Sequence, residues 1–177
     1  RFGPGGFRRV DARGELARDV AVFSARPGRN WRSLYDTAVA AQILYSSPTA
    51  WSTLRRGTDF YDESTLLWLE VDTNIRQLTH GSRSLDDYAR AFYGPPSGPP
   101  KVIPYTREDV ERALDQVAPY DWKSFFVARV DSATVAPPLG GVTTSGWKIA
   151  YPDSLTEYYD AIETLNEGRI GIGAQMV

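Results

Sequence analysis

Residues 59–78 read Asp-Phe-Tyr-Asp-Glu-Ser-Thr-Leu-Leu-Trp-Leu-Glu-Val-Asp-Thr-Asn-Ile-Arg-Gln-Leu, and this stretch decides the fold class. Apolar residues recur at positions 60, 67, 71, 75 and 78, which is the spacing of one face of an α-helix. Leu66, Trp68 and Leu69 widen the apolar stripe. The sequence therefore predicts a long helix that packs against neighbours on more than one side.

Short polar residues mark where the helices begin and end. Asp59 or Thr58 is the expected N-cap of the long helix, and His80-Gly81 is a typical stop. Ser84 is the expected N-cap of the next helix, with Asp87 as its reciprocal partner. Two further helices are predicted to start at residue 106, with a threonine cap, and at residue 121, with an aspartate cap.

The remaining sequence predicts more helices and a small β element. Residues 10–24 and 34–44 have helical character, and Arg26-Pro27-Gly28-Arg29 ends the first of these segments. β-type residues with a hairpin-like Ser-Gly occupy positions 142–151, a further helix is predicted within 151–168, and residues 170–174 alternate as in a strand. We predict a mainly α fold with a helical part at 1–136 and a short β-containing segment at 137–177.

Composition excludes several classes of function. The 177 residues carry 20 basic and 22 acidic side chains, so the net charge of −2 predicts no strong attraction to nucleic acid or to an anionic membrane. Apolar runs stay shorter than the ~20 residues that a membrane span needs. The absence of cysteine excludes disulfides and fits cytoplasm and periplasm equally well. No signal peptide is visible at Arg1. Because the sequence does not begin with methionine, we expect that Arg1 is not the native start.

Side chains able to carry out catalysis are few. His80 is the only histidine, so the two-histidine zinc motif of helical metallopeptidases is missing, and His80 itself is expected at a helix C-terminus. Asp62-Glu63 and Asp86-Asp87 lie at predicted helix N-termini, where negative charge favours the helix. Glu70 and Asp72 are expected to form structural pairs with arginine, and Arg76 lies one turn beyond Asp72.

Several separated blocks, in order, resemble the glycyl-aminopeptidase-like zinc metallopeptidases, a family that also carries a PDZ domain. The similarity spans about residues 26–151 and includes the following blocks: Arg26-Pro27-Gly28-Arg29, Phe60-Tyr61-Asp62-Glu63, Leu66-Leu67-Trp68-Leu69, Ser84-Leu85-Asp86-Asp87, Pro119-Tyr120-Asp121-Trp122, Phe125-Phe126 and Gly146-Trp147. The resemblance implies the helical C-terminal half of a thermolysin-like catalytic domain. It places the zinc ligands upstream of this chain and a PDZ domain after about residue 170.

The resemblance also implies one catalytic residue. Tyr61 matches a tyrosine of a Tyr-x-x-Gly pattern that opens this helix in related aminopeptidases and stabilises the oxyanion. Here Ser64 replaces the glycine, a difference that bears on how closely the helix approaches substrate. A phenol stays protonated at neutral pH and can donate a hydrogen bond to developing negative charge. Arg26 and Arg29 are expected to pair with carboxylates.

Three hypotheses follow from the sequence. The first is a C-terminal part of a zinc aminopeptidase that is inactive alone, with zinc, the missing half of the catalytic domain and a peptide substrate supplied in the parent protein. The second is a non-enzymatic helical module that binds another protein. The third is a metallopeptidase relative that has lost its zinc.

Overall fold

The computed structural model describes residues 9–44, 52–94, 98–99, 101–134, 138–151, 153 and 175–176, and within them the chain is mainly helical, as predicted. In chain order the elements are α1 (Arg9–Ser24), the 3₁₀ helix η1 (Pro27–Asn30), α2 (Leu34–Leu44), α3 (Ser52–Arg55), α4 (Phe60–Leu78), α5 (Leu85–Tyr93), α6 (Arg107–Val117), α7 (Trp122–Phe126), the π-helical turn η2 (Val127–Asp131), α8 (Gly140–Thr144), β1 (Ile149–Ala150) and β2 (Gln175–Met176).

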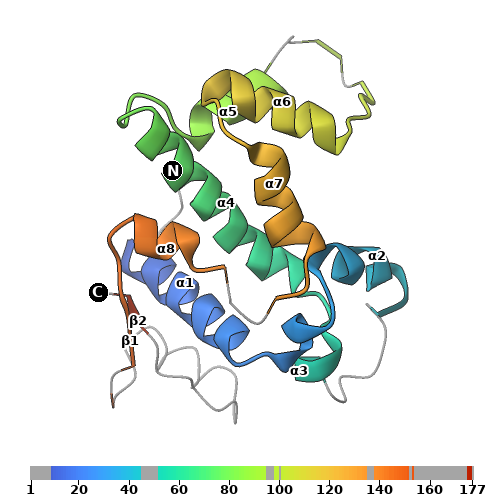
Figure 1. Ribbon diagram of the computed structural model, residues 1–177, viewed down its shortest axis with the longest axis vertical. Coiled ribbons are helices and arrows are strands. Elements are labelled where there is room, and N and C mark those ends of the chain that lie inside the picture. Colours follow the sequence, from blue (N-terminus) through green and yellow to red (C-terminus); the bar gives the residue numbers. More distant parts are fainter. Residues whose placement is uncertain are drawn as a thin grey trace.

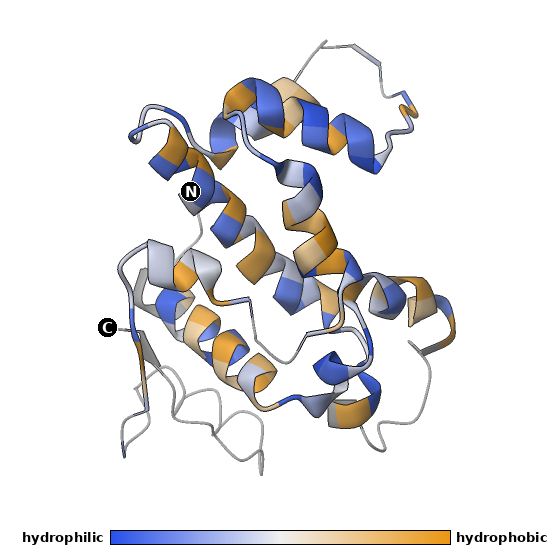
Figure 2. Ribbon diagram, in the orientation of Figure 1, coloured by the Kyte–Doolittle hydropathy of each residue, from blue (hydrophilic) through white to orange (hydrophobic). Residues whose placement is uncertain are grey.

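Helix α4 is the centre of the molecule and separates two hydrophobic clusters (Figure 1). On one side Leu67, Val71 and Ile75 of α4 pack with apolar residues of α5, α6 and α7. On another side Leu66 packs with α1 and with Val142 of α8. Figure 2 shows hydrophobic and hydrophilic residues side by side around α4, as this packing requires. The predicted helix with more than one buried side is therefore confirmed.

The predicted caps of the shorter helices are present. Ser84 and Asp87 form a reciprocal capping box at the start of α5, and Thr106 and Asp109 form a second one at α6. The carboxylate of Asp121 accepts a hydrogen bond from the backbone N–H of Ser124 at α7. These contacts lie within four residues of sequence, which is why short sequence patterns predict them well.

The start of α4 differs from the prediction. Asp59 occupies the N-cap position, but its backbone is in the right-handed helical region and its side chain forms no capping hydrogen bond. Its carboxylate binds Arg26 and Arg56 instead. The prediction of Asp59 as a side-chain cap is wrong because two arginine side chains draw the carboxylate away from the helix end.

The predicted end of α4 is confirmed. His80 and Gly81 both have positive φ, 52° and 79°, and the backbone N–H of Gly81 donates to the carbonyl of Arg76 at 2.7 Å. This left-handed turn closes the helix and satisfies one of its last carbonyl groups.

The predicted β segment at 142–151 is correct only at its end. Its first residues belong to α8, Gly146 turns the chain with a φ of 82°, and strand β1 covers Ile149–Ala150 alone. β1 pairs antiparallel with β2, with Ile149 opposite Met176. Local β preference is overridden because Val142 is buried in the α1–α4 cluster. The predicted helix within 151–168 and strand at 170–174 lie outside the described residues.

Candidate functional site

Tyr61 lies in the first turn of α4 and is 60% exposed. Its ring leans on Phe60, with the ring centroids 4.5 Å apart and a tilt of 38°. The backbone carbonyl of Tyr61 accepts hydrogen bonds from Ser64 Oγ at 2.8 Å and Thr65 Oγ1 at 3.3 Å. Ser64 therefore directs its hydroxyl back onto the helix that carries Tyr61. The phenol itself faces outward.

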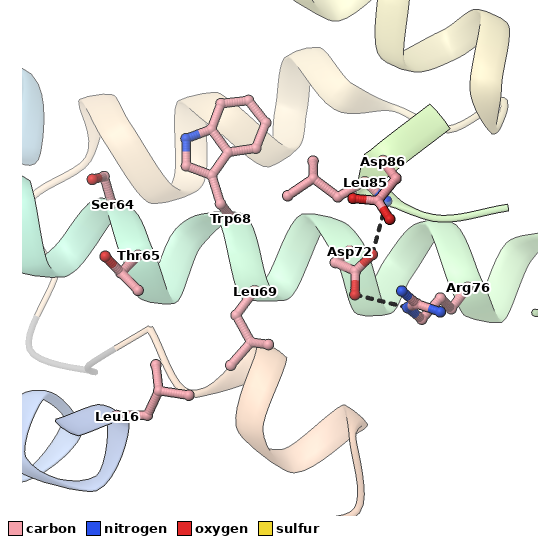
Figure 3. Close-up of a pocket in the computed structure, with 9 residues that line it drawn as sticks. All are labelled: Leu16, Ser64, Thr65, Trp68, Leu69, Asp72, Arg76, Leu85 and Asp86. Atoms are coloured by element: carbon pink, nitrogen blue, oxygen red, sulfur yellow. Dashed lines mark hydrogen bonds and ion pairs between the residues drawn. The ribbon is translucent and has the colours of Figure 1, made fainter. Parts of the chain in front are cut away.

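A groove of about 600 Å³ runs along α4 one turn beyond Tyr61. Its middle is apolar, and Figure 3 shows Leu16 of α1 below Leu69 while Trp68 stands on the other side of α4. Trp68 is fixed by stacking on Tyr88, with 5.5 Å between ring centroids. The lining residues are Leu16, Ser64, Thr65, Trp68, Leu69, Asp72, Arg76, Leu85 and Asp86. We call this feature the α4 groove.

Tyr61 and the α4 groove share one face of the helix. Thr65 follows Tyr61 by four residues, and side chains four residues apart lie one above the other on a helix. Residues 61 and 76 are 15 positions apart, which corresponds to about 22 Å along the axis. An extended peptide rises about 3.3 Å per residue, so this face spans roughly six or seven residues of peptide.

The far end of the groove is polar, and its charged side chains Asp72 and Arg76 form an ion pair with each other. Asp72 accepts a hydrogen bond from Arg76 Nε at 2.7 Å and another from the backbone N–H of Leu85 at 2.8 Å (Figure 3). The hydrogen bond that Arg76 donates to Asp72 raises the pKa of the Arg76 guanidinium above its ordinary value. The predicted Asp72–Arg76 pair is confirmed, and the same carboxylate also joins α4 to the start of α5.

Beneath Tyr61, on the buried side of α4, lies a cluster of ion pairs. Asp59 binds Arg26 and Arg56, and Glu63 binds Arg29 and Arg56. We call these five residues the ion-pair cluster. Arg29, Arg56, Asp59 and Glu63 are each less than 5% exposed. The predicted pairing of Arg26 and Arg29 with carboxylates is confirmed.

Sequence reasoning missed Arg56, which joins the two carboxylates. Its Nε donates to Asp59 at 3.1 Å, and its Nη1 donates to the carbonyl of Arg32 at 2.7 Å. The available signal was the position of Glu63, four residues before Leu67 and therefore on the apolar face of the predicted helix, with Asp59 one turn earlier. Two acidic side chains at that spacing, near an arginine pair at 55–56, indicate a shared buried partner.

Glu70 forms a separate buried pair farther along α4. Its two carboxylate oxygens accept hydrogen bonds from Arg129 at 2.7 and 2.9 Å in a bidentate arrangement. This contact raises the pKa of Arg129. The predicted structural role of Glu70 with an arginine is confirmed, although the arginine comes from η2, 59 residues later.

Asp19 of α1 is a buried acid close to the start of α4. Burial, followed by repulsion from Asp62, raises the pKa of Asp19 from 3.8 to about 7, and attraction to Arg18 partly opposes this. Asp62 follows Tyr61 directly. Proton uptake by Asp19 near neutral pH therefore changes the charge that faces Asp62.

The described residues do not fit a metal site. Among them, no group of three or more His, Cys, Asp or Glu side chains could hold a metal ion. His80 is exposed beyond the C-terminal end of α4, about 28 Å along the axis from Tyr61.

Within the residues that the structure describes, no helix combines the length and apolar character needed to cross a bilayer. No protein-family model matches the sequence, and a search of curated proteins finds no match.

Proposed function

We propose that this chain supplies the helical C-terminal half of the catalytic domain of a zinc-dependent aminopeptidase-type metallopeptidase. The parent reaction is hydrolysis of a peptide bond near the N-terminus of a substrate. The metal and its ligands come from outside the residues described above, so the chain alone is expected to be inactive. The fold-level part of this proposal, a thermolysin-like origin, rests on the ordered sequence blocks.

One observation carries the proposal. The residue that the resemblance marks as catalytic, Tyr61, is exposed and lies on the same helical face as the α4 groove. Tyr88, by contrast, turns its ring into the core and is only 2% exposed. The exposed position leaves the hydroxyl accessible to a substrate.

In this proposal the Tyr61 hydroxyl donates a hydrogen bond to the oxygen of the scissile carbonyl as that oxygen becomes negative. A tyrosine hydroxyl can donate one hydrogen bond through its O–H group. Removing one preorganised donor of this kind from an enzyme costs about 2.7–4 kcal/mol of transition-state stabilisation, or ~10²–10³ in kcat. The α4 groove would receive the substrate beyond the reacting bond.

The experiment is Tyr61→Phe in the intact protein, assayed with a glycyl chromogenic peptide and with zinc content measured in parallel. We expect kcat to fall by about a hundredfold or more, with zinc content and folding unchanged. Tyr35→Phe is the matched control, because Tyr35 is exposed to a similar extent (58%) on α2. Unchanged turnover in Tyr61→Phe would refute the role of Tyr61.

A binding function is the second candidate, and α2 favours it. Tyr35, Val39 and Ile43 follow one another at four-residue spacing, and each is more than half exposed. Such a stripe is typical of a helix that contacts another protein. The same assay distinguishes the peptidase function from the binding function. Zinc-dependent turnover by the intact protein supports the peptidase, whereas an intact protein that binds no zinc and cleaves nothing supports the binding module or a relative without metal.

A further inference from the structure

The central helix α4 begins without the side-chain capping bond that α5, α6 and α7 have. Helices α5, α6 and α7 each start with a side chain that accepts a backbone N–H. At α4 the N-cap residue Asp59 forms no such bond. Helix starts expose N–H groups that lack partners within the helix, and an uncapped first turn frays more easily. The turn that carries Tyr61 therefore depends on other contacts.

The ion-pair cluster supplies those contacts, and each of its carboxylate oxygens accepts a hydrogen bond from a particular guanidinium group. Glu63 accepts from Arg29 through Oε1 and from Arg56 through Oε2. Asp59 accepts from Arg26 through Oδ1 and from Arg56 through Oδ2. Each carboxylate thus has its two oxygens bound by two different guanidinium groups. Hydrocarbon packing tolerates small rotations of a helix, whereas this pattern of bonds holds in one orientation only.

The backbone of Arg56 adopts an unfavourable conformation within the ion-pair cluster. Its φ is 54°, a left-handed conformation that is unfavourable for a residue with a side chain. Its guanidinium is buried and also donates to the carbonyl of Arg32. Strained backbone persists where the surrounding contacts determine it, and it is common at functional sites.

We propose that the ion-pair cluster sets the rotation of the first turn of α4 and so aims the phenol of Tyr61, with Glu63 as a positioning residue. Residues 61 and 63 are about 200° apart around a helix of 3.6 residues per turn. Glu63 therefore points into the protein while Tyr61 points out of it. Any turn of the helix start that moved Glu63 from its arginines would swing Tyr61 away as well. The catalytic consequence rests on the proposed function, but the control of the helix start does not.

Amide hydrogen exchange on the 177-residue chain tests the control of the first turn directly. The amides of Tyr61 and Glu63 donate to the carbonyls of Thr58 and Asp59 at 3.2 and 2.9 Å. Glu63→Gln should speed exchange at these two amides about tenfold more than the matched variant Glu70→Gln does, since the latter breaks a buried pair of the same helix two turns away. Equal acceleration at these amides in both variants, or none in either, would overturn the inference.

A second variant keeps the test decisive if Glu63→Gln does not fold. Arg26→Lys changes the most accessible member of the cluster, whose side chain is 26% exposed. Lysine keeps the charge but loses the planar guanidinium geometry. Faster exchange confined to the amides of Tyr61 and Glu63 supports the inference, and exchange identical to that of the unmodified chain contradicts it.

Kinetics of the intact, zinc-loaded protein test whether the cluster orients the Tyr61 side chain. Glu63→Gln should lower kcat by about tenfold to a hundredfold with little change in KM, because a misplaced donor loses transition-state contact rather than substrate binding. Glu70→Gln should leave kcat within about twofold of the unmodified enzyme. If both variants lower kcat equally, Glu63 has no positioning role. If Tyr61→Phe leaves turnover unchanged, the proposed function fails, and the exchange experiment still decides the part of the inference that concerns the helix start.

Discussion

A methyl group added at residue 141 should push α8 away from α4. An ideal Cβ on Gly141 would lie 2.6 Å from the backbone nitrogen of Glu70 and 2.8 Å from both the carbonyl carbon and the Cγ of Leu69. Cβ atoms essentially never approach other atoms closer than 3.0 Å. Because two of the three neighbours belong to the α4 backbone, α8 itself has to move, by roughly 0.4 to 0.8 Å, to reach an acceptable contact of 3.0–3.4 Å.

The change in the free energy of unfolding follows from two opposing effects. Forcing extra volume into a packed contact costs about 1–3 kcal/mol. Replacing glycine by alanine inside a helix returns up to ~1 kcal/mol through helix propensity. Because two of the three close atoms belong to the backbone, the cost of the extra volume lies in the upper part of its range, at about 2–3 kcal/mol. We therefore expect Gly141→Ala to lower the free energy of unfolding by about 1–2 kcal/mol, or Tm by about 2–8 °C for a chain of this size.

Urea or thermal unfolding followed by circular dichroism measures this change. Gly57→Ala is the control, since a Cβ at residue 57 meets no atom within 4 Å, and its Tm should stay close to that of the unmodified chain. A Gly141→Ala variant as stable as the unmodified chain, or more stable, would refute the close approach of α8 to α4.

Two further predictions concern stability. The raised pKa of Asp19, about 7 in the folded chain against 3.8 when unperturbed, means that the folded state binds this proton more tightly than the unfolded state does. The unfolding free energy should therefore fall as pH rises from about 4 to about 7, by at most ~4 kcal/mol at ~1.4 kcal/mol per pKa unit. Asp19→Asn should match the unmodified chain near pH 4 and exceed its stability at pH 8 in urea titrations, and identical pH profiles would contradict the assignment. Separately, Thr106→Ala removes the hydroxyl that accepts the backbone N–H of Asp109 in the α6 capping box, while the backbone N–H of residue 106 can still donate to the Asp109 carboxylate. This change should cost about 1 kcal/mol in the same assay, whereas Thr65→Ala at an exposed position of α4 should cost clearly less.

Local sequence patterns predicted the features that depend on neighbours within about one turn. The long helix, its left-handed end at Gly81, the caps at Ser84 and Thr106, and the Asp72–Arg76 pair all belong to this group. Each depends on residues three to five positions apart, so the sequence itself holds both partners of the interaction.

Features that join distant segments were predicted poorly. Asp59 was expected to cap α4, but Arg26, 33 residues earlier, binds its carboxylate. Residues 142–144 have β-type character, yet two glycines before them allow the chain to lie against α4 as a helical turn. The α4 groove also could not be predicted, because its sides come from α1, α4 and α5. Tyr61 was identified through family resemblance, and its catalytic role stays a prediction.

The two buried carboxylates of α4 fix the position of this helix along its axis relative to the segments that pack against it. Glu63 and Glu70 are seven residues apart, or about 10.5 Å, and they meet guanidinium groups from different parts of the chain. A shift of one turn would break the pairs of Glu63 with Arg29 and of Glu70 with Arg129. Separating a buried carboxylate from its partner is far more costly than a mismatch of apolar side chains. A single inserted or deleted residue between positions 63 and 70 would turn one carboxylate by about 100° relative to the other. Length changes within this segment should therefore be tolerated less well than substitutions at its exposed positions.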